Sequence, residues 1–480
     1  MSAPQQLQLL EHNFHQVRLD ERRILFHIPT TSLFEMDTLT AAVVDFLGEH
    51  GRVPPASVNE RLATVFPAEE VGRTLCELRD LGVVGDPSEP MEARPPPEIK
   101  QFPLSTLVLN VNTGCNLSCT YCYKEDLTTP AHGQKMDLAT AQRSVELLLQ
   151  EGARRDKINI VFFGGEPLSN LPLIQQVVDY AERRCAEQQV AVDFSLTTNA
   201  TLLTEPMIDY LNAHRFGISV SMDGPKALHD LTRLTVGGKG TYDVVARKVR
   251  LLLQRYTARP VGARVTLTRD NVDVLAIHHH LREELGFHEV GFAPATASDN
   301  AAFNLGENEL ATVFQGLQTL GRQYLEAALQ NRNIGFSNMH QMMTDLWQGT
   351  RKALPCGAGL GMLAVDKAGD LHLCHRFTGS RLPTFGNVHA GGIAKETLGG
   401  FLNAAMDRSG YGCSTCRIRS LCAGGCYHES YSRYGDPFKP VYHYCELLRE
   451  WVDFGIAAYA RLQAGNPAFF EHHIAPRRAH

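Results

Sequence analysis

The sequence predicts an α/β protein built around a partial (β/α)6 TIM-like barrel, with a small winged-helix-like domain before the barrel and a loop-rich region after it. Three observations carry this prediction. Apolar, strand-like runs alternate six times with helical stretches in the middle of the chain. A proline-rich, charged segment precedes these runs. Cysteine and glycine become dense beyond residue 350.

The composition is that of an ordinary globular protein. The chain has 480 residues, of which 44% are hydrophobic and 20% are charged, and at about 150 residues per domain this length predicts three domains. The net charge of −6 provides no broad cationic field, so we expect no nucleic-acid partner. No apolar run approaches the roughly 18 residues of a membrane span, and the first residues lack the apolar core of a signal peptide. We therefore expect a cytoplasmic protein without a membrane partner.

Residues 1–85 are expected to form a domain of their own. Residues 15–20 and 24–29 have the pattern of two short strands, and three helical patterns follow them. Strands followed by short helices predict the winged-helix-like module, and a plain N-terminal cap fits the pattern equally well. The helical patterns cover residues 39–47, 58–64 and 71–81. Residues 86–103 are rich in proline and charge, which indicates a linker.

The barrel is predicted over residues 104–335. Strands that alternate with helices of this length indicate βαβ units and a parallel sheet. Six such units fall short of the eight of a closed TIM barrel, so the barrel is expected to be partial. The predicted strands are residues 106–112, 157–163, 190–197, 216–221, 261–267 and 289–292. Helical patterns between them include residues 139–150, 173–187 and 244–253.

Twelve cysteines in a reducing compartment are metal ligands or catalytic groups more often than disulfides. Cys115, Cys119 and Cys122 follow the first predicted strand with the spacing C-x3-C-x2-C. A structural zinc site would need a fourth ligand, and none follows promptly. A [4Fe–4S] cluster on three thiolates instead leaves one iron open for a small molecule. The triplet also lies at the carboxyl edge of a parallel strand, where α/β folds place their chemistry.

This motif on a parallel-strand repeat resembles the radical S-adenosylmethionine (radical SAM) superfamily. The resemblance implies that Cys115, Cys119 and Cys122 hold a [4Fe–4S] cluster whose open iron binds the amino and carboxylate groups of SAM. It further implies that reductive cleavage of SAM gives a 5′-deoxyadenosyl radical, which removes a hydrogen atom from a substrate. Tyr121 matches the aromatic residue beside the adenine.

Further matches to the family follow later strands. Gly164, Gly165 and Glu166 resemble the motif that binds the amino group of SAM, and a turn with a solvated glutamate is the alternative. The segments 197–201 and 221–224 resemble contacts to the SAM ribose and carboxylate. Singly, each of these later matches fits a turn or an N-cap equally well. The remaining expected SAM contacts are Asn199, Ser221 and Arg233, the last of which matches an arginine that pairs with the SAM carboxylate in the family.

Seven cysteines lie between residues 356 and 445, more than one tetrahedral metal can use. Their spacing resembles the SPASM extension of radical SAM enzymes. This implies two auxiliary [4Fe–4S] clusters, three clusters in all, in a domain over residues 350–460, with residues 461–480 as a tail. Two structural zinc ions are the alternative. The implied ligands are Cys356, Cys374 and Cys426 for auxiliary cluster I, and Cys413, Cys416, Cys422 and Cys445 for auxiliary cluster II.

Auxiliary cluster I lacks a fourth cysteine, because none follows Cys356 closely. The cluster is either completed from elsewhere or open, and an open iron suits a substrate thiolate. His375 stands where sulfatase-maturing relatives carry an aspartate base, so it is a candidate proton acceptor, with a packing role as the alternative. The two other cysteines, Cys76 and Cys185, fall in helical patterns and are expected to be buried small hydrophobes.

The SPASM extension implies a peptide or protein substrate. Residues 1–85 resemble a recognition module to whose sheet edge a leader peptide adds a strand. Residues 24–47 and 373–380 most resemble the peptide-thioether maturases, which join a Cys sulfur to the carbon next to an Asp or Glu carboxylate. The implied partners are a Cys-containing peptide or protein and an electron donor of flavodoxin or ferredoxin type. The alternatives are a sulfatase-type maturase that generates formylglycine and a non-catalytic, zinc-stabilised peptide-binding protein.

Overall fold

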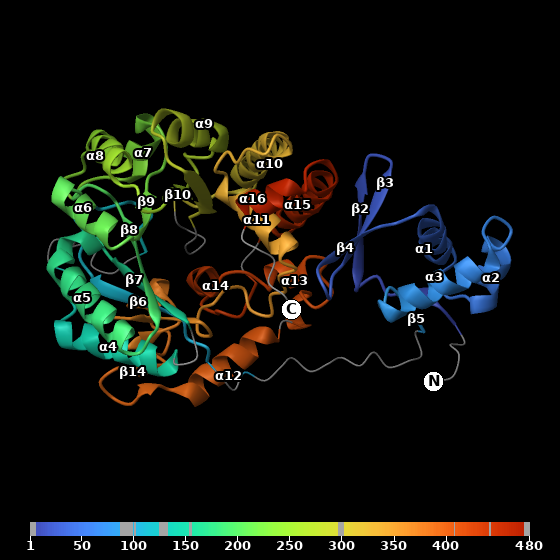
Figure 1. The fold of residues 1–480 in the computed structure, drawn as a ribbon, viewed down its shortest axis with the longest axis horizontal. Coiled ribbons are helices and arrows are strands. Elements are labelled where there is room, and N and C mark those ends of the chain that lie inside the picture. The colour runs from blue at the N-terminus through green and yellow to red at the C-terminus, as the bar shows by residue number, and fades with distance from the viewer. Residues whose placement is uncertain are drawn as a thin grey trace.

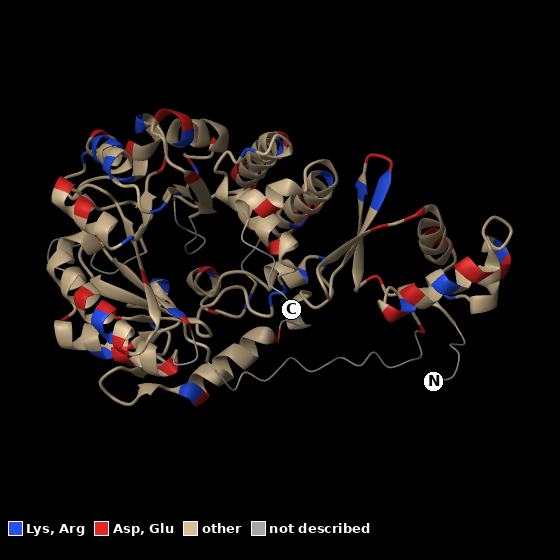
Figure 2. Cartoon of the chain, viewed as in Figure 1, with Lys and Arg blue, Asp and Glu red and all other residues tan. Residues whose placement is uncertain are grey.

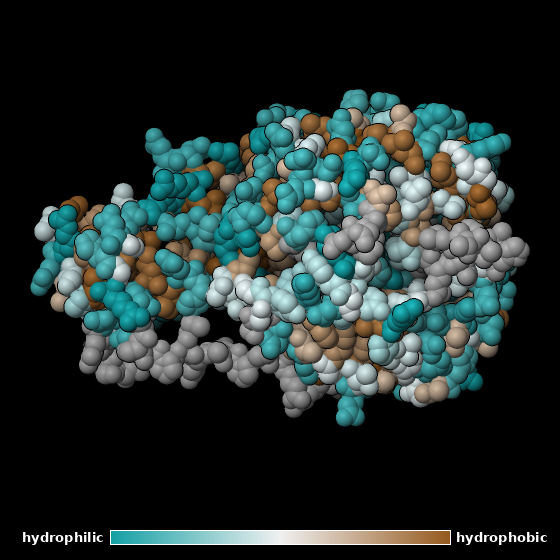
Figure 3. Space-filling view, turned by 180° about the vertical axis from the view of Figure 1, so that it is seen from behind, coloured by the Kyte–Doolittle hydropathy of each residue, from teal (hydrophilic) through white to brown (hydrophobic). Residues whose placement is uncertain are grey.

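The computed structural model of the protein describes residues 6–86, 99, 102–123, 133–152, 156–295, 302–407, 409–440 and 443–474. An N-terminal domain projects from a larger body that contains the barrel and the cysteine-rich region (Figure 1). Seen from behind, the same domain stands out at the side of the body (Figure 3). The predicted linker, residues 86–103, lies mostly outside the described residues.

The N-terminal domain places a three-stranded antiparallel sheet before three helices. The sheet has the order β2-β3-β4, so β4 is paired on one side only. Asp37 begins the first helix by accepting a hydrogen bond from the Thr40 backbone NH at 2.7 Å. The strands are β1 (Gln8–Leu9), β2 (Phe14–Leu19), β3 (Arg22–His27), β4 (Ser32–Glu35) and β5 (Val84–Gly85), the last paired with β1. The helices are α1 (Thr38–His50), α2 (Pro55–Leu62) and α3 (Ala68–Asp80).

The body contains an eight-stranded sheet of order β11-β10-β9-β8-β7-β6-β12-β13. Its strands β6 to β11 are parallel and adjacent in chain order, which confirms the predicted α/β fold with a parallel sheet. In β7 exposure alternates along the strand, as a two-residue period requires. These strands are β6 (Thr106–Asn112), β7 (Lys157–Gly164), β8 (Ala191–Thr198), β9 (Gly217–Ser221), β10 (Val261–Leu267) and β11 (Glu289–Pro294).

Helices cover the outer face of the curved sheet (Figure 1). In α5 the buried residues Ile174, Val178, Ala181 and Cys185 recur at spacings of three or four, which gives the helix one apolar face. Acidic and basic residues are interspersed along these outer helices (Figure 2). The helices are α4 (Leu138–Glu151), η2 (Pro167–Asn170), α5 (Leu171–Glu187), α6 (Glu205–Ala213), α7 (Lys226–Thr232), α8 (Tyr242–Arg255), α9 (Val274–His279) and η3 (His280–Glu284).

The cysteine-rich region continues the barrel sheet. Strand β12 pairs in parallel with β6, and β13 pairs antiparallel with β12. The strands are β12 (Met362–Val365), β13 (Leu371–His372), β14 (Gly386–Asn387) and β15 (Gly392–Ile393). The helices are α10 (Glu307–Leu329), α11 (Ser337–Trp347), η4 (His375–Phe377), α12 (Lys395–Met406), η5 (Ser409–Tyr411), α13 (Arg419–Cys422), α14 (Tyr427–Tyr434), α15 (Cys445–Gly465) and α16 (Ala468–His473).

The expectation of a tail over residues 461–480 is wrong for the part that the structure describes. Helix α15 runs to Gly465, and α16 buries Phe469 and Phe470 completely. The apolar pair outweighs the weak periodicity of this segment, because burying two phenylalanines removes a large apolar area from water. Within the described residues, no helix is long and apolar enough to cross a bilayer.

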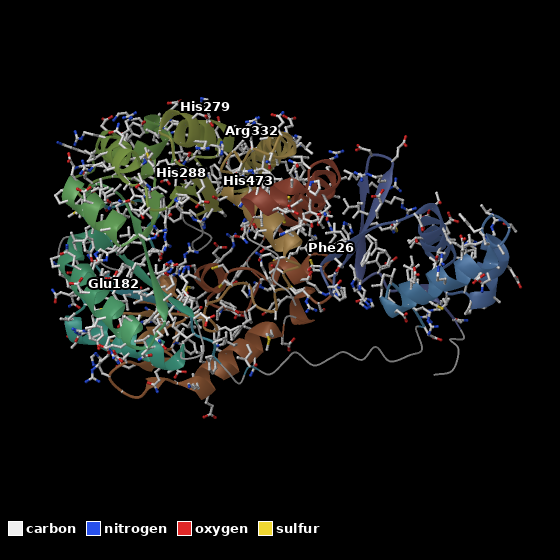
Figure 4. The ribbon with its side chains drawn as sticks, in the orientation of Figure 1. Phe26, Glu182, His279, His288, Arg332 and His473 are labelled. Atoms are coloured by element: carbon white, nitrogen blue, oxygen red, sulfur yellow. The ribbon has the colours of Figure 1, made fainter. Side chains whose placement is uncertain are left out.

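The N-terminal sheet packs against α15. Val17, Ile24 and Phe26 belong to the hydrophobic core of the body, whereas Leu25 belongs to the separate core under α1–α3. Phe26 lies where the sheet meets the C-terminal helices (Figure 4). Two polar contacts border this junction: His15 Nε2 lies 3.0 Å from Asp453 Oδ1, and Arg461 Nη2 donates to Asp20 Oδ1 at 2.8 Å.

Candidate active site

The first cysteine loop leaves the carboxyl end of β6 and is fixed by the loop after α7. The Ser118 NH donates to the Leu234 carbonyl at 2.8 Å, and the Thr120 NH donates to the Thr232 carbonyl at 3.0 Å. Burial, together with Glu166 and the two other thiols of the triplet, raises the pKa of Cys115 to about 12. The structure therefore places the three predicted ligands near one another in a partly buried loop, and their role as cluster ligands stays a prediction.

Gly164 and Gly165 allow the end of β7 to lie directly against this loop. A Cβ at Gly165 would stand 2.1 Å from the Gly114 carbonyl oxygen, and one at Gly164, where φ is +148°, would stand 2.4 Å from the Asn112 carbonyl oxygen. The Glu166 NH also donates to the Gly114 carbonyl at 3.1 Å. No side chain fits at either glycine, so both support the position of the cysteine loop.

Glu166 is buried and joins two strand ends. Its carboxylate accepts hydrogen bonds from the Asn199 NH at 2.7 Å, the Thr198 hydroxyl at 2.8 Å and the Leu168 NH at 3.1 Å. Burial outweighs these hydrogen bonds and raises the pKa of Glu166 to about 7. The alternative of a solvated turn residue is therefore wrong. The predicted contact of Glu166 with the amino group of SAM stays a prediction.

Asn199 connects the end of β8 to the cysteine loop. Its Nδ2 donates to Asn116 Oδ1 at 3.0 Å and lies 3.7 Å from Cys115 Sγ, while its Oδ1 accepts from the Thr201 NH at 3.0 Å. Ser221 ends β9 at the same edge of the sheet. Both residues thus lie at the carboxyl edge, as predicted, although the amide of Asn199 already has protein partners.

Arg233 forms a buried ion pair that the sequence did not predict. Its Nε lies 2.8 Å from Asp223 Oδ2, and the Tyr121 hydroxyl donates to the same oxygen at 2.6 Å. Although burial alone would lower it, the pKa of Arg233 is raised, because Asp223 and Tyr121 lie beside the guanidinium. Asp223 also accepts from the Thr266 NH at 2.9 Å. Arg233 therefore has an internal partner in addition to its predicted role at the SAM carboxylate.

The auxiliary cysteines fall into the same two groups as the predicted ligand sets. Burial, then the neighbouring Cys426 and Cys356, raises the pKa of Cys374 to about 12. Burial also raises the pKa of Cys422 to about 11, and Cys416, Cys445 and Cys413 add to the effect. Across the described ranges, no three His, Cys, Asp or Glu side chains converge closely enough to hold a single metal ion.

Tyr123 lies between the first cysteine loop and the auxiliary group of Cys374. Its ring centre is 5.3 Å from that of His428 and 5.0 Å from the Arg376 guanidinium carbon. Arg376 in turn has Nη1 3.9 Å from Cys426 Sγ. Tyr123 and Arg376 were not predicted from the sequence. The position of Tyr123, an aromatic residue directly after the third cysteine of the triplet, is the signal that would have indicated it.

Three further predicted residues have clear positions. The ring of His375 packs at a tilt against that of Phe163, with centres 4.2 Å apart, so it lies beside the glycine pair at the end of β7. Its role as a base stays a prediction. Cys185 is buried, as predicted. Cys76 is exposed, so the prediction of a buried side chain is wrong there, because α3 turns its apolar residues Val71, Leu75 and Leu78 inward instead.

Comparisons with known proteins agree with this geometry. Residues 109–273 match the model of the Radical SAM superfamily. The serine-type anaerobic sulfatase-maturating enzyme of Klebsiella aerogenes is 25% identical over 387 residues, which cover 74% of this chain and 92% of that enzyme.

Two solved structures share the fold. Native anSMEcpe with bound AdoMet has a TM-score of 0.63 at 20% identity, over 76% of this chain and 99% of that one. Native anSMEcpe with bound AdoMet and Cp18Cys peptide has a TM-score of 0.61 at 19% identity, over the same 76% and 99%. At these identities the likeness shows the fold alone, an α/β fold with a parallel sheet.

Proposed function

We propose that this radical SAM protein is a peptide maturase that forms thioether crosslinks between a Cys sulfur and the carbon next to an Asp or Glu carboxylate within one polypeptide. The observation that carries the proposal is the gathering of ten cysteines into groups of three, three and four. Residues 24–47 and 373–380 resemble the peptide-thioether maturases. On this resemblance we propose the small subunit of quinohemoprotein amine dehydrogenase as the substrate.

The cysteine groups fit the proposed cofactors. Thiolates are the usual ligands of [4Fe–4S] clusters, and a group of four completes one cluster whereas a group of three leaves an iron open. On these residues, the clusters and SAM would supply a 5′-deoxyadenosyl radical and a route for the surplus electron. Cys115, Cys119 and Cys122 would hold the SAM-binding cluster, and the glycines after β7 leave room for close backbone approach.

A groove in the N-terminal domain supports a peptide substrate. The groove has a volume of about 700 Å³ and lies between β4 and the helices α11 and α15. Its lining includes Ser32, Leu33 and Glu35 of β4 and Tyr459 and Gln463 of α15. Because β4 is paired on one side only, a peptide can extend the sheet there through backbone hydrogen bonds.

A second candidate function is the generation of formylglycine. The likeness to a sulfatase-maturating enzyme over 74% of this chain favours it. The histidine at position 375, in place of the aspartate base of those relatives, and the incomplete first auxiliary set favour the thioether reaction instead. A zinc-stabilised, non-catalytic binding protein remains the alternative of another class.

The deciding experiment is anaerobic turnover with SAM, a flavodoxin or dithionite as reductant, and peptides that contain Cys and Asp or Glu. Mass spectrometry is expected to show the loss of two hydrogen atoms per crosslink and protection of the sulfur from alkylation. A product that has lost its thiol without a crosslink would establish the formylglycine reaction. A preparation with zinc in place of roughly twelve iron atoms would contradict both enzyme proposals.

A further inference from the structure

Arg264 is a charged residue in the middle of an apolar strand, β10. It pairs with Ser221 of β9 on one side and with Gly291 of β11 on the other. A Cβ at Gly291 would stand 3.0 Å from Arg264 Nη1, so the guanidinium lies across β11 in space that this glycine leaves open.

Within the described residues, the Arg264 side chain has neither an ion pair nor a hydrogen bond. The Arg264 side chain is exposed to solvent. Desolvation by nearby protein atoms still lowers the pKa of Arg264, and Arg376 lowers it further, while Glu289 and Glu429 act in the opposite direction. An arginine remains protonated under such conditions, so the structure holds two neighbouring cations where an anion would be stabilised.

The acidic residues near Arg264 have other partners. Glu429 lies 3.5 Å from Arg376, and Glu289 accepts a hydrogen bond from the Ser337 hydroxyl at 3.2 Å. Arg376 also faces the Tyr123 ring and Cys426. Of the two neighbouring arginines, Arg376 already has protein partners, so the Arg264 guanidinium is the one that is available to bind a ligand.

Arg264 has neighbours in both places where the proposed reaction occurs. Its carbonyl accepts from the Met222 NH at 3.2 Å, next to Asp223, which accepts a hydrogen bond from Tyr121 of the first cysteine loop. The charge of Arg376, which follows Cys374 of the auxiliary group by two residues, acts on the Arg264 guanidinium.

We propose that the Arg264 guanidinium binds the side-chain carboxylate of the substrate residue whose carbon is crosslinked. This inference rests on the proposed thioether reaction and deepens it. A carboxylate held at Arg264 fixes the adjacent carbon between the first cysteine loop and the auxiliary cysteines. Guanidinium and carboxylate match in charge and in planar geometry, which makes the site selective for Asp or Glu over their amides.

The first test needs no substrate protein. The reconstituted full chain is treated with phenylglyoxal, which modifies free guanidinium groups, and labelling is located by peptide mass spectrometry. Saturating N-acetyl-aspartate amide or N-acetyl-glutamate amide is expected to reduce labelling of Arg264 about tenfold. The corresponding Asn and Gln compounds should give no protection. Arg250, on the outer helix α8, is the internal control, and its labelling should not change.

Three outcomes of this test would overturn the proposal. They are an Arg264 that never reacts, equal protection by the acids and the amides, and protection by SAM alone. The last would assign the guanidinium to the carboxylate of SAM instead.

The second test measures crosslinked peptide per deoxyadenosine formed. Arg264→Gln is expected to lower this ratio about 100-fold for peptides with Asp or Glu, with partial rescue by Arg264→Lys. Arg250→Ala should match the unsubstituted protein. An unchanged ratio in Arg264→Gln would contradict the proposal. If the unsubstituted protein crosslinks no peptide, the thioether reaction fails, and the labelling result still decides whether Arg264 binds a carboxylate.

Discussion

The two cysteine-bearing regions are held in place by different means. The first loop lies on the rim of the barrel, where buried side chains at the ends of β7, β8 and β9 fix it: Glu166, Asn199 and Asp223 each have protein partners. The auxiliary region consists of short helices and two-residue strands packed through aromatic contacts such as Phe377 with His428.

The difference between the two cysteine-bearing regions is clearest in the backbone just before Cys426, in the auxiliary region. Ala423, Gly424 and Gly425 all have positive φ values, of 51°, 88° and 91°. The glycines adopt such values freely, whereas the left-handed conformation of Ala423 is unfavourable unless the surroundings fix it. We therefore expect that the barrel shapes the first site before any ligand binds, whereas the auxiliary region depends on its ligands for its shape.

Loss of one cysteine from the first site is the largest expected effect on activity. Cys115→Ala should lower deoxyadenosine formation to background, because the predicted cluster loses a ligand. Its melting temperature should stay close to that of the unsubstituted protein, since the barrel rim keeps the loop in place. Deoxyadenosine is measured by liquid chromatography after anaerobic incubation with SAM and reductant, and a large drop in melting temperature would contradict the comparison.

Cys445→Ala should have the opposite profile. Some uncoupled SAM cleavage should remain, because the first site is intact, while the melting temperature falls further than in Cys115→Ala. Metal binding contributes directly to the folding of loop-rich regions, so the loss of a ligand lowers the free energy of unfolding. Calorimetry on both variants, with iron content measured in parallel, checks this. Equal melting temperatures of the two variants would show that the two cysteine-bearing regions depend on their ligands to the same extent.

The next prediction concerns the buried ion pair between Asp223 and Arg233, which contacts the first cysteine loop through Tyr121. Asp223→Asn leaves Arg233 buried beside a neutral amide, and breaking a buried pair in this way costs about 3–5 kcal/mol of stability. Replacing both partners, with Asp223→Asn and Arg233→Met together, should recover part of this loss. Denaturant unfolding of the single and double variants measures the difference. A double variant less stable than Asp223→Asn would mean that Arg233 acts mainly through other contacts.

Glu166 predicts a pH dependence of stability. Its pKa is raised to about 7, above its usual value of 4.5, so the folded state binds the proton more tightly than the unfolded state. Stability therefore falls as the pH rises from about 4.5 to 7, by up to about 3 kcal/mol. Glu166→Gln should flatten this part of the profile, and Glu326→Gln, on the exposed side of α10, should not. Melting temperatures between pH 5 and 8 provide the measurement.

The smallest effects on activity are expected at Cys185 and Cys76, the two cysteines outside the three groups. Their variants serve as controls for the loss of a cysteine that is not a predicted ligand. Cys185→Ser places a hydroxyl in the buried face of α5 and should cost about 1–3 kcal/mol. Cys76→Ser, on the exposed side of α3, should stay within about 0.5 kcal/mol. Deoxyadenosine formation should be unchanged in both. A loss of activity in Cys76→Ser would mean that α3 has a role beyond packing.

The sequence predicted the barrel well because its strands are long and alternate with amphipathic helices. Strands β6 and β10 match their predicted ranges at both ends. Strand β12 was missed, since four residues in a glycine-rich stretch carry too little pattern, and it forms only because β6 offers a free edge. Helix α15 was not predicted either. It begins at Cys445 within the predicted cluster domain, and its polar and apolar residues lie on several sides, so the sequence shows no clear helical pattern there.

The site was predicted as sets of residues rather than as contacts. The resemblance to the SPASM extension implied the auxiliary cysteine sets, and the structure places members of each set near one another, while their role as cluster ligands stays a prediction. The partner of Arg233 was not predictable, because Asp223 lies ten residues away on another loop. Arg264 did leave a signal: a lone charge in an apolar strand is costly unless it faces a cavity or a ligand.

The groove beside β4 is built from segments that lie far apart in the chain: residues 32–35 of β4, residues 346–351 in and after α11, and residues 459–464 of α15. During synthesis the first of these segments leaves the ribosome long before the last exists. A chain that stops short of Tyr459 has all ten clustered cysteines and lacks one wall of the groove. The groove therefore becomes complete only after the last of the clustered cysteines has been made.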